Sequence, residues 1–240
     1  MDHECPNSDP DTTARRAAAQ EVAQLVEPGM ALGLGSGRAV WAAVDAIATR
    51  LGDATGTLTA VCASAATERA AEAAGIVALP LMAGSDLALA IDGTDELTTG
   101  LDLLKGGGGA LLRERLVLSA ARRFVVVAEQ PKLVSRLGET RRLPVEIARF
   151  GAQATQRRLA LLVGDPQLRL EDDGNPFVTE EGHLLLDAEI PGDASLPLLH
   201  TQLLTTPGVM DHGLFLGVAD EALVGRPDGT VATFTRDPLG

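Results

Sequence analysis

The 240-residue sequence predicts an α/β protein, with a Rossmann-like parallel-sheet domain and a smaller α+β (ferredoxin-like) domain inserted before the C-terminal strands. Short apolar segments alternate with longer segments of helical periodicity, and the apolar segments are hydrophobic at consecutive positions, as strands buried on both faces are. This alternation stops near Glu139 and returns near the C-terminus. We therefore expect a first domain of residues 1–138 plus 218–240, and a second domain of residues 139–217.

The first domain is expected to open with a helix over residues 14–26, for which Thr12 or Thr13 is the N-cap and Pro28-Gly29 is the end. The apolar runs that follow predict strands at residues 30–34, 58–62, 76–80, 87–91 and 124–128. The segments between them predict helices at residues 35–51 (after a glycine turn), 66–75, 110–123 and 131–138. Strands alternating with helices are typical of a parallel sheet covered on both faces.

The second domain is expected to mix strands and helices. The pattern predicts a strand at 143–147, a helix around 155–163, a hairpin within 177–190, a helix at 196–204 and a strand-like segment at 209–217. Residues 219–236 are strand-like again and are expected to rejoin the first domain. The aliphatic strands of the insertion favour a contact between copies, so we expect a homodimer or homotetramer.

Composition restricts the possible partners. The net charge is −13, which argues against nucleic acid, because phosphate backbones require a basic surface. No apolar run is long enough to span a membrane, and the polar, acidic start does not resemble a secretory signal. Cys5 and Cys62 provide no disulfide framework. A cytoplasmic protein is expected, with its first eleven residues mobile.

Lysine is used at two positions only. Of the 20 basic residues, Lys105 and Lys132 are lysines and the other 18 are arginines. A compact ammonium donates in places where a planar guanidinium does not fit, so both lysines are candidates for binding or catalysis.

Two loops are expected beyond the carboxyl ends of the parallel strands, where open α/β sheets bind ligands. The first is GLGSGR, residues 33–38, between a strand and a helix. It is neither a Walker A loop nor a good dinucleotide fingerprint. Its free amides and helix N-terminus suit an anion, and Arg38 adds a bidentate donor. The alternative is an ordinary tight turn.

The second loop lies in DGTDELTTGLDLLKGGGGALLRERL, residues 92–116. Asp92 and Asp95 follow a strand, Lys105 precedes four glycines, and Glu114 lies in the next helix. Taken singly, the aspartates are ordinary turn residues and Glu114 is an ordinary solvated charge. Together they place acids, an ammonium and backbone donors within 23 positions, a combination that chance supplies much less readily.

This segment resembles the signature of the ribose-5-phosphate isomerase type A family, DGADE…KGGGGALLREK. Further segments, GLGSGRAV, VVVAEQPKLVSRLG, LPVEI, PGVMDHGLF and ALVGRPDGTV, resemble the family in the same order along most of the chain. The resemblance implies interconversion of ribose 5-phosphate and ribulose 5-phosphate through an enediol, in the non-oxidative branch of the pentose phosphate pathway, without metal or organic cofactor.

The resemblance also implies roles for individual residues. Glu114 would be the base, Lys105 with amides of the glycine run would stabilise charge on the carbonyl oxygen, Asp92 would assist ring opening and proton traffic at oxygen, and Asp95 would bind substrate hydroxyls. Residues implied to bind the phosphosugar are Gly35, Ser36, Gly37, Arg38, Gly106, Gly107, Gly108, Gly109, Lys132 and Arg15 (or its neighbour Arg16).

The sequence departs from the family in the phosphate loop, where Thr-Gly-Ser-Thr is expected and Ser36-Gly37-Arg38-Ala39 is present. The segment CASAAT around Ser64 is also poorer in hydroxyls. These changes leave open a different phosphosugar as substrate. Two other classes remain as alternatives: a non-catalytic sugar-phosphate sensor on the same fold, which would not need the acid/base set, and a CoA-transferase-like enzyme, which would form a covalent glutamyl intermediate.

Overall fold

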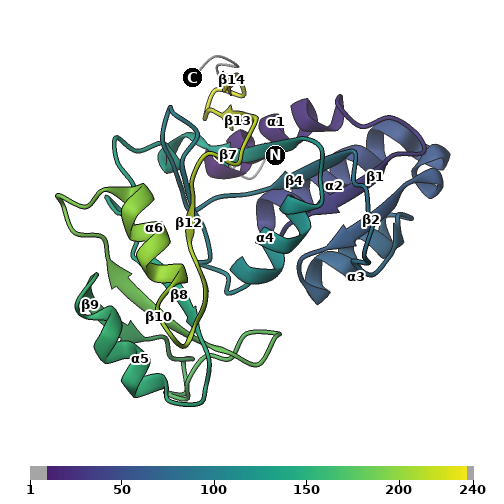
Figure 1. The fold of residues 1–240 in the computed structure, drawn as a ribbon. Helices are drawn as coiled ribbons and strands as arrows, with labels where there is room; N and C mark the ends of the chain where they lie inside the picture. The colour runs from purple at the N-terminus through teal and green to yellow at the C-terminus, as the bar shows by residue number, and fades with distance from the viewer. Residues whose placement is uncertain (1–9, 237–240) are drawn as a thin grey trace, which may run out of the picture.

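The computed structural model describes residues 10–236, so Cys5 and the expectation of a mobile start fall largely outside the described residues. Within them, a central sheet has the strand order β14-β13-β7-β4-β1-β2-β3 (Figure 1). The strands are β1 Ala31–Leu34, β2 Thr59–Cys62, β3 Val77–Ala78, β4 Leu89–Asp92, β7 Phe124–Glu129, β13 Glu221–Gly225 and β14 Val231–Thr235. Every neighbouring pair is parallel except the β13–β14 hairpin. The predicted parallel sheet, rejoined by the C-terminal strands, is confirmed.

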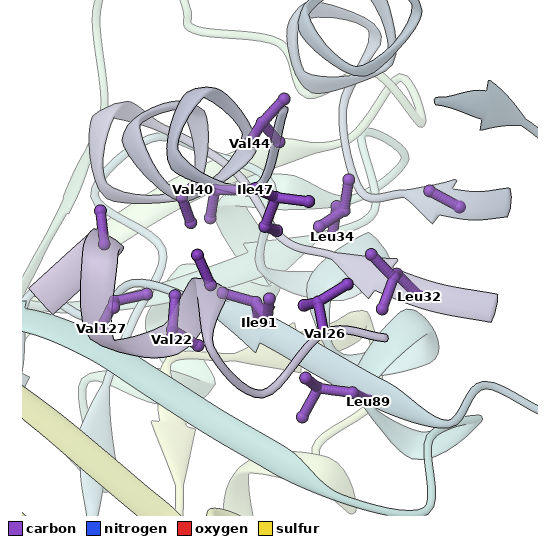
Figure 2. Close-up of a cluster of buried hydrophobic side chains, with 14 of the residues drawn as sticks. Val22, Val26, Leu32, Leu34, Val40, Val44, Ile47, Leu89, Ile91 and Val127 are labelled. Carbon is purple, nitrogen blue, oxygen red and sulfur yellow. The ribbon is translucent and has the colours of Figure 1, made fainter. Parts of the chain in front are cut away.

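Helices cover both faces of this sheet. Helices α1 Pro10–Ala23, α2 Arg38–Leu51 and α3 Ala65–Ala73 lie on one face, and α4 Leu111–Ser119 lies on the other. Figure 2 shows the core under α1 and α2, where Val22, Val40 and Ile47 meet Leu34 and Ile91 of the sheet. Consecutive apolar residues in each strand supply both cores. No helix of residues 10–236 is long and apolar enough to span a membrane.

The predicted limits of two helices are wrong. Helix α1 already includes Thr12 and Thr13, so neither is its N-cap, and it ends at Ala23. Proline at Pro10 suits a first helical turn, because the N–H it lacks would have no partner there. Helix α4 stops at Ser119 because the next residues pair with Leu87, which accepts from the Arg122 amide at 2.8 Å.

The helix predicted at 131–138 is a single 3₁₀ turn, η2 Gln130–Lys132. Amides beyond this turn donate to two residues far away in sequence. The amide of Val134 donates to the Leu97 carbonyl at 2.9 Å, and that of Gly138 donates to the Glu96 carboxylate at 2.5 Å. These longer-range bonds replace the i→i−4 bonds that a helix would need.

The inserted domain has the order β-α-β-β-α-β. Its elements are β8 Leu143–Ile147, α5 Ala152–Leu159, β9 Gly164–Leu168, β10 Leu184–Glu189, α6 Leu196–Leu204 and β11 Val209–His212. The strands form an antiparallel sheet in the order β11-β8-β10-β9, which is the ferredoxin-like arrangement expected. In Figure 1 this domain lies apart from the α1–α3 layer.

The predicted hairpin within 177–190 is present only at its turn, where the Thr179 amide donates to the His183 carbonyl at 3.0 Å. Its first half makes one isolated bridge, Val178 to Leu184, and β10 pairs instead with β8 and β9. Strand β9 was not predicted, because its sequence GDPQL contains glycine, aspartate and proline, which strands disfavour. It is the edge strand of the sheet, where proline is tolerated.

A small third sheet joins the two parts of the molecule. Strands β5 Glu96–Leu97 and β6 Leu103–Leu104 form a hairpin, and β12 Leu214–Phe215, which follows the inserted domain, pairs with β6. Neither β5 nor β6 was predicted, because each is two residues long. The hairpin places Lys105, directly after β6, close to Asp92 at the end of β4. The domain boundaries at 138/139 and 217/218 stay a prediction.

Candidate active site

The candidate site lies at the carboxyl end of the central sheet. A cavity of about 340 Å³ opens beyond β1, β4 and β7, beside the glycine run and the first turn of α4. Its lining comprises Ser36, Gly37, Arg38, Ala39, Trp41, Gly93, Thr94, Asp95, Lys105, Gly106, Gly107, Gly108, Glu114, Glu129 and Lys132. Loops far apart in sequence meet here because parallel strands end at one edge of the sheet.

A buried ammonium and two carboxylates form the centre of the site. The Nζ of Lys105 lies 2.8 Å from Oδ2 of Asp92 and 3.3 Å from Oε2 of Glu114. All three side chains are buried. The three residues come from different segments, at the end of β4, after β6 and in α4, and Lys105 and Glu114 both line the cavity.

Asp92 lies at the bottom of the site. Its Oδ1 accepts hydrogen bonds from the amides of Gly93, at 2.7 Å, and Ser36, at 3.2 Å. Burial and, after it, the nearby Glu114 carboxylate together raise the pKa of Asp92 to about 7, against the opposing effect of Lys105. The carboxyl is therefore able to exchange a proton near neutral pH.

Lys105 is held as a cation. Burial by itself lowers the pKa of the ammonium, but the carboxylates of Asp92 and Glu114 outweigh it, so the pKa lies above its ordinary value. The ammonium also donates to the Gly93 carbonyl at 2.6 Å. At the backbone, the Lys105 amide donates to Gly213 at 2.9 Å, which ties the residue to the strand that returns from the inserted domain.

Glu114 lies in the first turn of α4, where the positive end of the helix dipole favours a carboxylate. Its Oε1 accepts a hydrogen bond from the Ser36 hydroxyl at 2.5 Å. Each carboxylate oxygen thus has a donor or cation beside it, and the side chain is 4% exposed. A carboxylate fixed in this way at a cavity wall is suited to move one proton between two neighbouring atoms.

The glycines of the site have different functions. A Cβ on Gly35 would lie 1.8 Å from the Asp92 carboxyl carbon, so only glycine lets the chain pass over that side chain. Gly106 and Gly109 have φ of +104° and +81°, conformations that favour glycine. Gly107 donates its amide to Asp95 Oδ2 at 2.7 Å.

Not every predicted site residue lines the cavity. Gly106, Gly107 and Gly108 line it, whereas Gly109 faces Phe177 and Gly35 lies behind Asp92. Ser64, which lies in the hydroxyl-poor segment, accepts from the Thr67 amide and caps α3.

Basic side chains gather at one end of the cavity. Arg38, at the start of α2, and Lys132 line it, and Lys132 Nζ lies 3.1 Å from Oε2 of Glu129. Arg15 Nε donates to the other Glu129 oxygen at 2.5 Å. Burial raises the pKa of Glu129, but Lys132 and Arg15 outweigh it and hold that pKa below its ordinary value. Arg15 and Arg16 line an adjoining groove of about 760 Å³ between α1 and α2.

Sequence reasoning missed three residues around the site. Glu129 holds Arg15 and Lys132, and its position at the end of β7 was the available signal. Glu96 is fully buried and accepts from the amides of Gly138, Thr140 and Arg141. Arg169 of the inserted domain donates to carbonyls of the glycine run. Glu96 lies in the DGTDE segment that carries the resemblance, but its contact with residues 138–141 could not be read from the sequence. The contact of Arg169 with the glycine run could not be read either, because these partners are distant along the chain.

Comparisons with known proteins agree with this geometry. The family model "Ribose 5-phosphate isomerase A (phosphoriboisomerase A)" matches residues 59–229. Ribose-5-phosphate isomerase A of Roseiflexus castenholzii is 44% identical over 220 residues, which cover 90% of this chain and 93% of that protein. The enzyme of Deinococcus radiodurans is 40% identical over 217 residues, covering 90% and 94%.

Solved structures give the same result. Ribose 5-phosphate isomerase A from Methanocaldococcus jannaschii matches with a TM-score of 0.86 and 31% identity, covering 92% of this chain and 98% of that one. A D-ribose-5-phosphate isomerase in complex with phospho-erythronic acid matches with a TM-score of 0.88 and 27% identity, covering 93% and 98%. With the family model spanning most of its length and relatives similar across nearly all of it, this chain belongs to the ribose 5-phosphate isomerase A family.

Proposed function

We propose that the protein interconverts ribose 5-phosphate and ribulose 5-phosphate through an enediol, with Glu114 as the base. The observation that carries the proposal is the contact of the Lys105 ammonium with two carboxylates, at 3.3 Å from Glu114, which lines the cavity with it, and at 2.8 Å from the buried Asp92 behind them. Aldose–ketose isomerisation needs a base beside two neighbouring carbons and donors beside their oxygens.

Glu114 moves the proton between the carbons. In the open-chain aldose its carboxylate takes the proton from C2, and the electrons of that C–H bond form the C1–C2 double bond of the enediol. Returning the same proton to C1 gives the ketose. The Ser36 hydroxyl, which donates to Glu114 at 2.5 Å, fixes the direction of the carboxylate for both transfers.

Lys105 and Asp92 act on the oxygens. As the C2 proton leaves, negative charge develops on the carbonyl oxygen, and the Lys105 ammonium stabilises it. The C1 oxygen gains a proton as the enediol forms, and the C2 hydroxyl loses one as the ketose forms. Asp92, whose pKa is raised to about 7, gives the first and takes back the second, and it exchanges a proton in the same way during ring opening. A single preorganised donor of this kind typically contributes about 3–4 kcal/mol to lowering the barrier.

The phosphate is proposed to bind at the basic end of the cavity. Arg38, Lys132 and the amides at the start of α2 offer donors there, and Glu129 fixes Lys132 in place. Arg15, held by the other Glu129 oxygen, adds positive charge from behind. Asp95 and the glycine run line the opposite side, where the sugar hydroxyls would lie.

An assay of ribulose 5-phosphate formation by the purified protein tests the proposal. Glu114→Gln should lower kcat about 10³-fold, because the amide cannot accept the proton. Glu68→Gln, on the exposed surface of α3, is the control and should retain the wild-type rate. An inert wild type would favour a phosphosugar sensor, and a fully active Glu114→Gln would exclude Glu114 as the base.

Arg38→Ser tests the phosphate end of the site in the same assay. Its KM should rise about tenfold with kcat within about threefold of wild type, and competitive inhibition by inorganic phosphate should weaken in parallel, because one charge-assisted bond is lost. Unchanged KM and phosphate inhibition would remove Arg38 from the phosphate site.

We also propose that the protein is a homodimer or homotetramer that associates through the inserted domain. Supporting this, several large apolar side chains of that domain are exposed, including Phe150 at 96% and Leu161 at 85%. A cytoplasmic location is proposed from the substrate class, since sugar phosphates are charged and are retained inside cells.

A further inference from the structure

An arginine of the inserted domain holds the glycine run of the catalytic domain. Arg169 follows β9, and its Nη1 donates to the carbonyl oxygens of Gly106 and Gly107, both at 3.0 Å. Its Nε donates to Oδ2 of Asp187 at 2.8 Å, and its Nη2 donates to the other oxygen of that carboxylate. The Arg169 side chain is 15% exposed, so this guanidinium is mostly removed from water.

These bonds fix the orientation of two peptide groups. In a trans peptide the carbonyl and the N–H point in opposite directions. In the Gly106–Gly107 peptide the carbonyl accepts from Arg169 and the N–H donates to Asp95 on the other side. In the Gly107–Gly108 peptide the carbonyl also accepts from Arg169, so the Gly108 N–H is directed away from the arginine.

The Gly108 amide is an unused donor at the cavity. It makes no hydrogen bond to any group within residues 10–236. Gly108 lines the cavity with Lys105, Glu114 and Ser36, and a Cβ on Gly108 would lie 4.0 Å from Ser36 Oγ. A free N–H in this place is a donor for an oxygen of a substrate held between the ammonium and the base.

We propose that Arg169 is a positioning residue of the isomerisation, which orients the Gly107–Gly108 peptide so that the Gly108 N–H binds the oxygen that becomes negative in the enediolate. The inference rests on the proposed function and deepens it. The guanidinium also polarises the peptide it contacts, which strengthens the N–H as a donor. The inserted domain thereby takes part in catalysis, because Arg169 and Asp187 both belong to it.

The need for fixation follows from the glycines. A glycine populates positive and negative φ with similar ease, so a peptide between two glycines turns over readily unless something holds it. Arginine suits the task better than lysine, because its planar fork binds the Asp187 carboxylate with one edge and the carbonyls with the remaining N–H groups.

The experiment compares Arg169→Met, Arg169→Lys and Asp187→Asn with wild type. Arg142→Met is the matched control, because Arg142 is in the same domain and pairs with Asp165 on the surface. We measure kcat, KM for ribose 5-phosphate, inhibition by phospho-erythronic acid and inhibition by inorganic phosphate. The carboxylate of phospho-erythronic acid carries its charge where the enediolate does, and inorganic phosphate reports on the other end of the site.

Arg169→Met should lower kcat 10- to 100-fold with KM changed less than threefold. The inhibition constant of phospho-erythronic acid should rise about tenfold, and that of inorganic phosphate should stay within twofold. Arg169→Lys and Asp187→Asn should fall between wild type and Arg169→Met, and Arg142→Met should match wild type.

The inference is overturned if Arg169→Met keeps kcat within twofold, or if inhibition by phospho-erythronic acid and by phosphate weakens equally, as general loosening of the site would produce. If Arg169→Met does not fold, as judged by its melting transition, Asp187→Asn is used instead. It keeps Arg169 but removes the carboxylate that holds its guanidinium in place. Failure of the proposed function would look different, since the wild-type enzyme would then be inactive.

Discussion

At the scale of single residues, the burial of the Asp92 carboxyl affects both activity and stability. Its carboxyl is buried beside a second carboxylate, which raises its pKa to about 7, and this places its proton exchange in the range where the enzyme would work. The same burial makes its ionised form a cost to folding. A substitution that removes the charge should therefore lower activity and change how stability depends on pH.

Asp92→Asn should lower kcat on the order of 10²-fold and remove the pH dependence of stability that this carboxyl causes. It also removes one of the two carboxylates beside the buried Lys105 ammonium, so its overall effect is destabilising, and less so at pH 8 than at pH 4. In wild type, the folded-state pKa of about 7 exceeds the ordinary 3.8, so between about pH 4 and pH 7 the unfolded state loses this proton while the folded state keeps it. Wild-type stability from this group thus falls as pH rises through that window and is constant above it. Asparagine does not ionise and avoids the loss.

Melting curves of Asp92→Asn and wild type at pH 4 and pH 8 measure this effect. The difference in Tm, variant minus wild type, should be less negative by several degrees at pH 8. Asp53→Asn, on the exposed surface, should show the same difference at both values of pH. A difference for Asp92→Asn that does not change with pH would contradict the raised pKa.

Gly35 is packed tightly against the Asp92 carboxyl. A Cβ there would lie 1.8 Å from the Asp92 carboxyl carbon, and neither the strand end nor the buried carboxyl has room to move. Gly35→Ala should destabilise the fold by about 1–3 kcal/mol through overpacking and lower kcat at least tenfold by displacing Asp92. Gly56→Ala, whose new Cβ would meet nothing within 4 Å, is the control. Wild-type kinetics in Gly35→Ala would mean that Asp92 tolerates displacement.

At the scale of elements, the sequence predicts best where local pattern and tertiary environment agree. Strand β7 is apolar from Phe124 to Ala128 and buried throughout, so its type could be predicted. The 3₁₀ turn η2 was predicted as a helix because 131–138 has a helical pattern. The amides of Val134 and Gly138, however, donate to Leu97 and Glu96 and not along a helix. Partners so distant in sequence leave no local signal.

The residues of the site were likewise predicted where the signal is local and missed where it depends on distant contacts. Asp92, Lys105 and Glu114 were found because they stand in one short segment, and the glycine run beside them is unusual. Arg169 was not found, because the glycine carbonyls it contacts lie more than 60 positions away and its surroundings in the sequence are those of any charged strand end. Chemistry concentrated in one loop is visible in a sequence, whereas the support it receives from another domain is not.

The loop after η2 offers a test at this scale. Glu96 is fully buried and its Oε1 accepts from the amides of Thr140 and Arg141, while Oε2 accepts from Gly138. Glu96→Gln replaces one acceptor by a donor and leaves at least one of these amides unsatisfied, so the free energy of unfolding should fall by about 1.5–3 kcal/mol. Chemical denaturation measures the loss, and faster hydrogen exchange at 138–141 should accompany it.

The control for Glu96→Gln is Glu139→Gln, whose carboxylate is on the surface of the same loop and accepts from Ser135. Its unfolding free energy should stay within about 0.5 kcal/mol of wild type. Equal effects of the two substitutions would show that the loop does not depend on its buried anchor.

At the scale of the whole molecule, the two domains are joined by more than the chain. Arg115 of α4 donates through Nε to Asp211 at 2.6 Å and through Nη2 to the His212 carbonyl at 2.8 Å, and its guanidinium lies over the Phe215 ring. The same segment also accepts a hydrogen bond from the Lys105 amide, at the Gly213 carbonyl. The helix that carries the proposed base and the strand that leaves the inserted domain are thus one connected unit, and Arg169 adds a second link.

The outer side of the inserted domain leads to the final prediction, on self-association. Phe150 and Leu161 flank α5 and are 96% and 85% exposed, and leaving large apolar surface in water is unfavourable. Light scattering coupled to size exclusion should give wild type a mass two or four times the protomer's 24.9 kDa. Phe150→Glu with Leu161→Glu should yield a monomer, because two carboxylates would have to be buried in the contact. Leu79→Glu with Met82→Glu, on the other domain, is the matched control and should keep the oligomer. A wild-type monomer would exclude self-association, and dissociation by the control pair alone would place the contact at the edge of the central sheet instead.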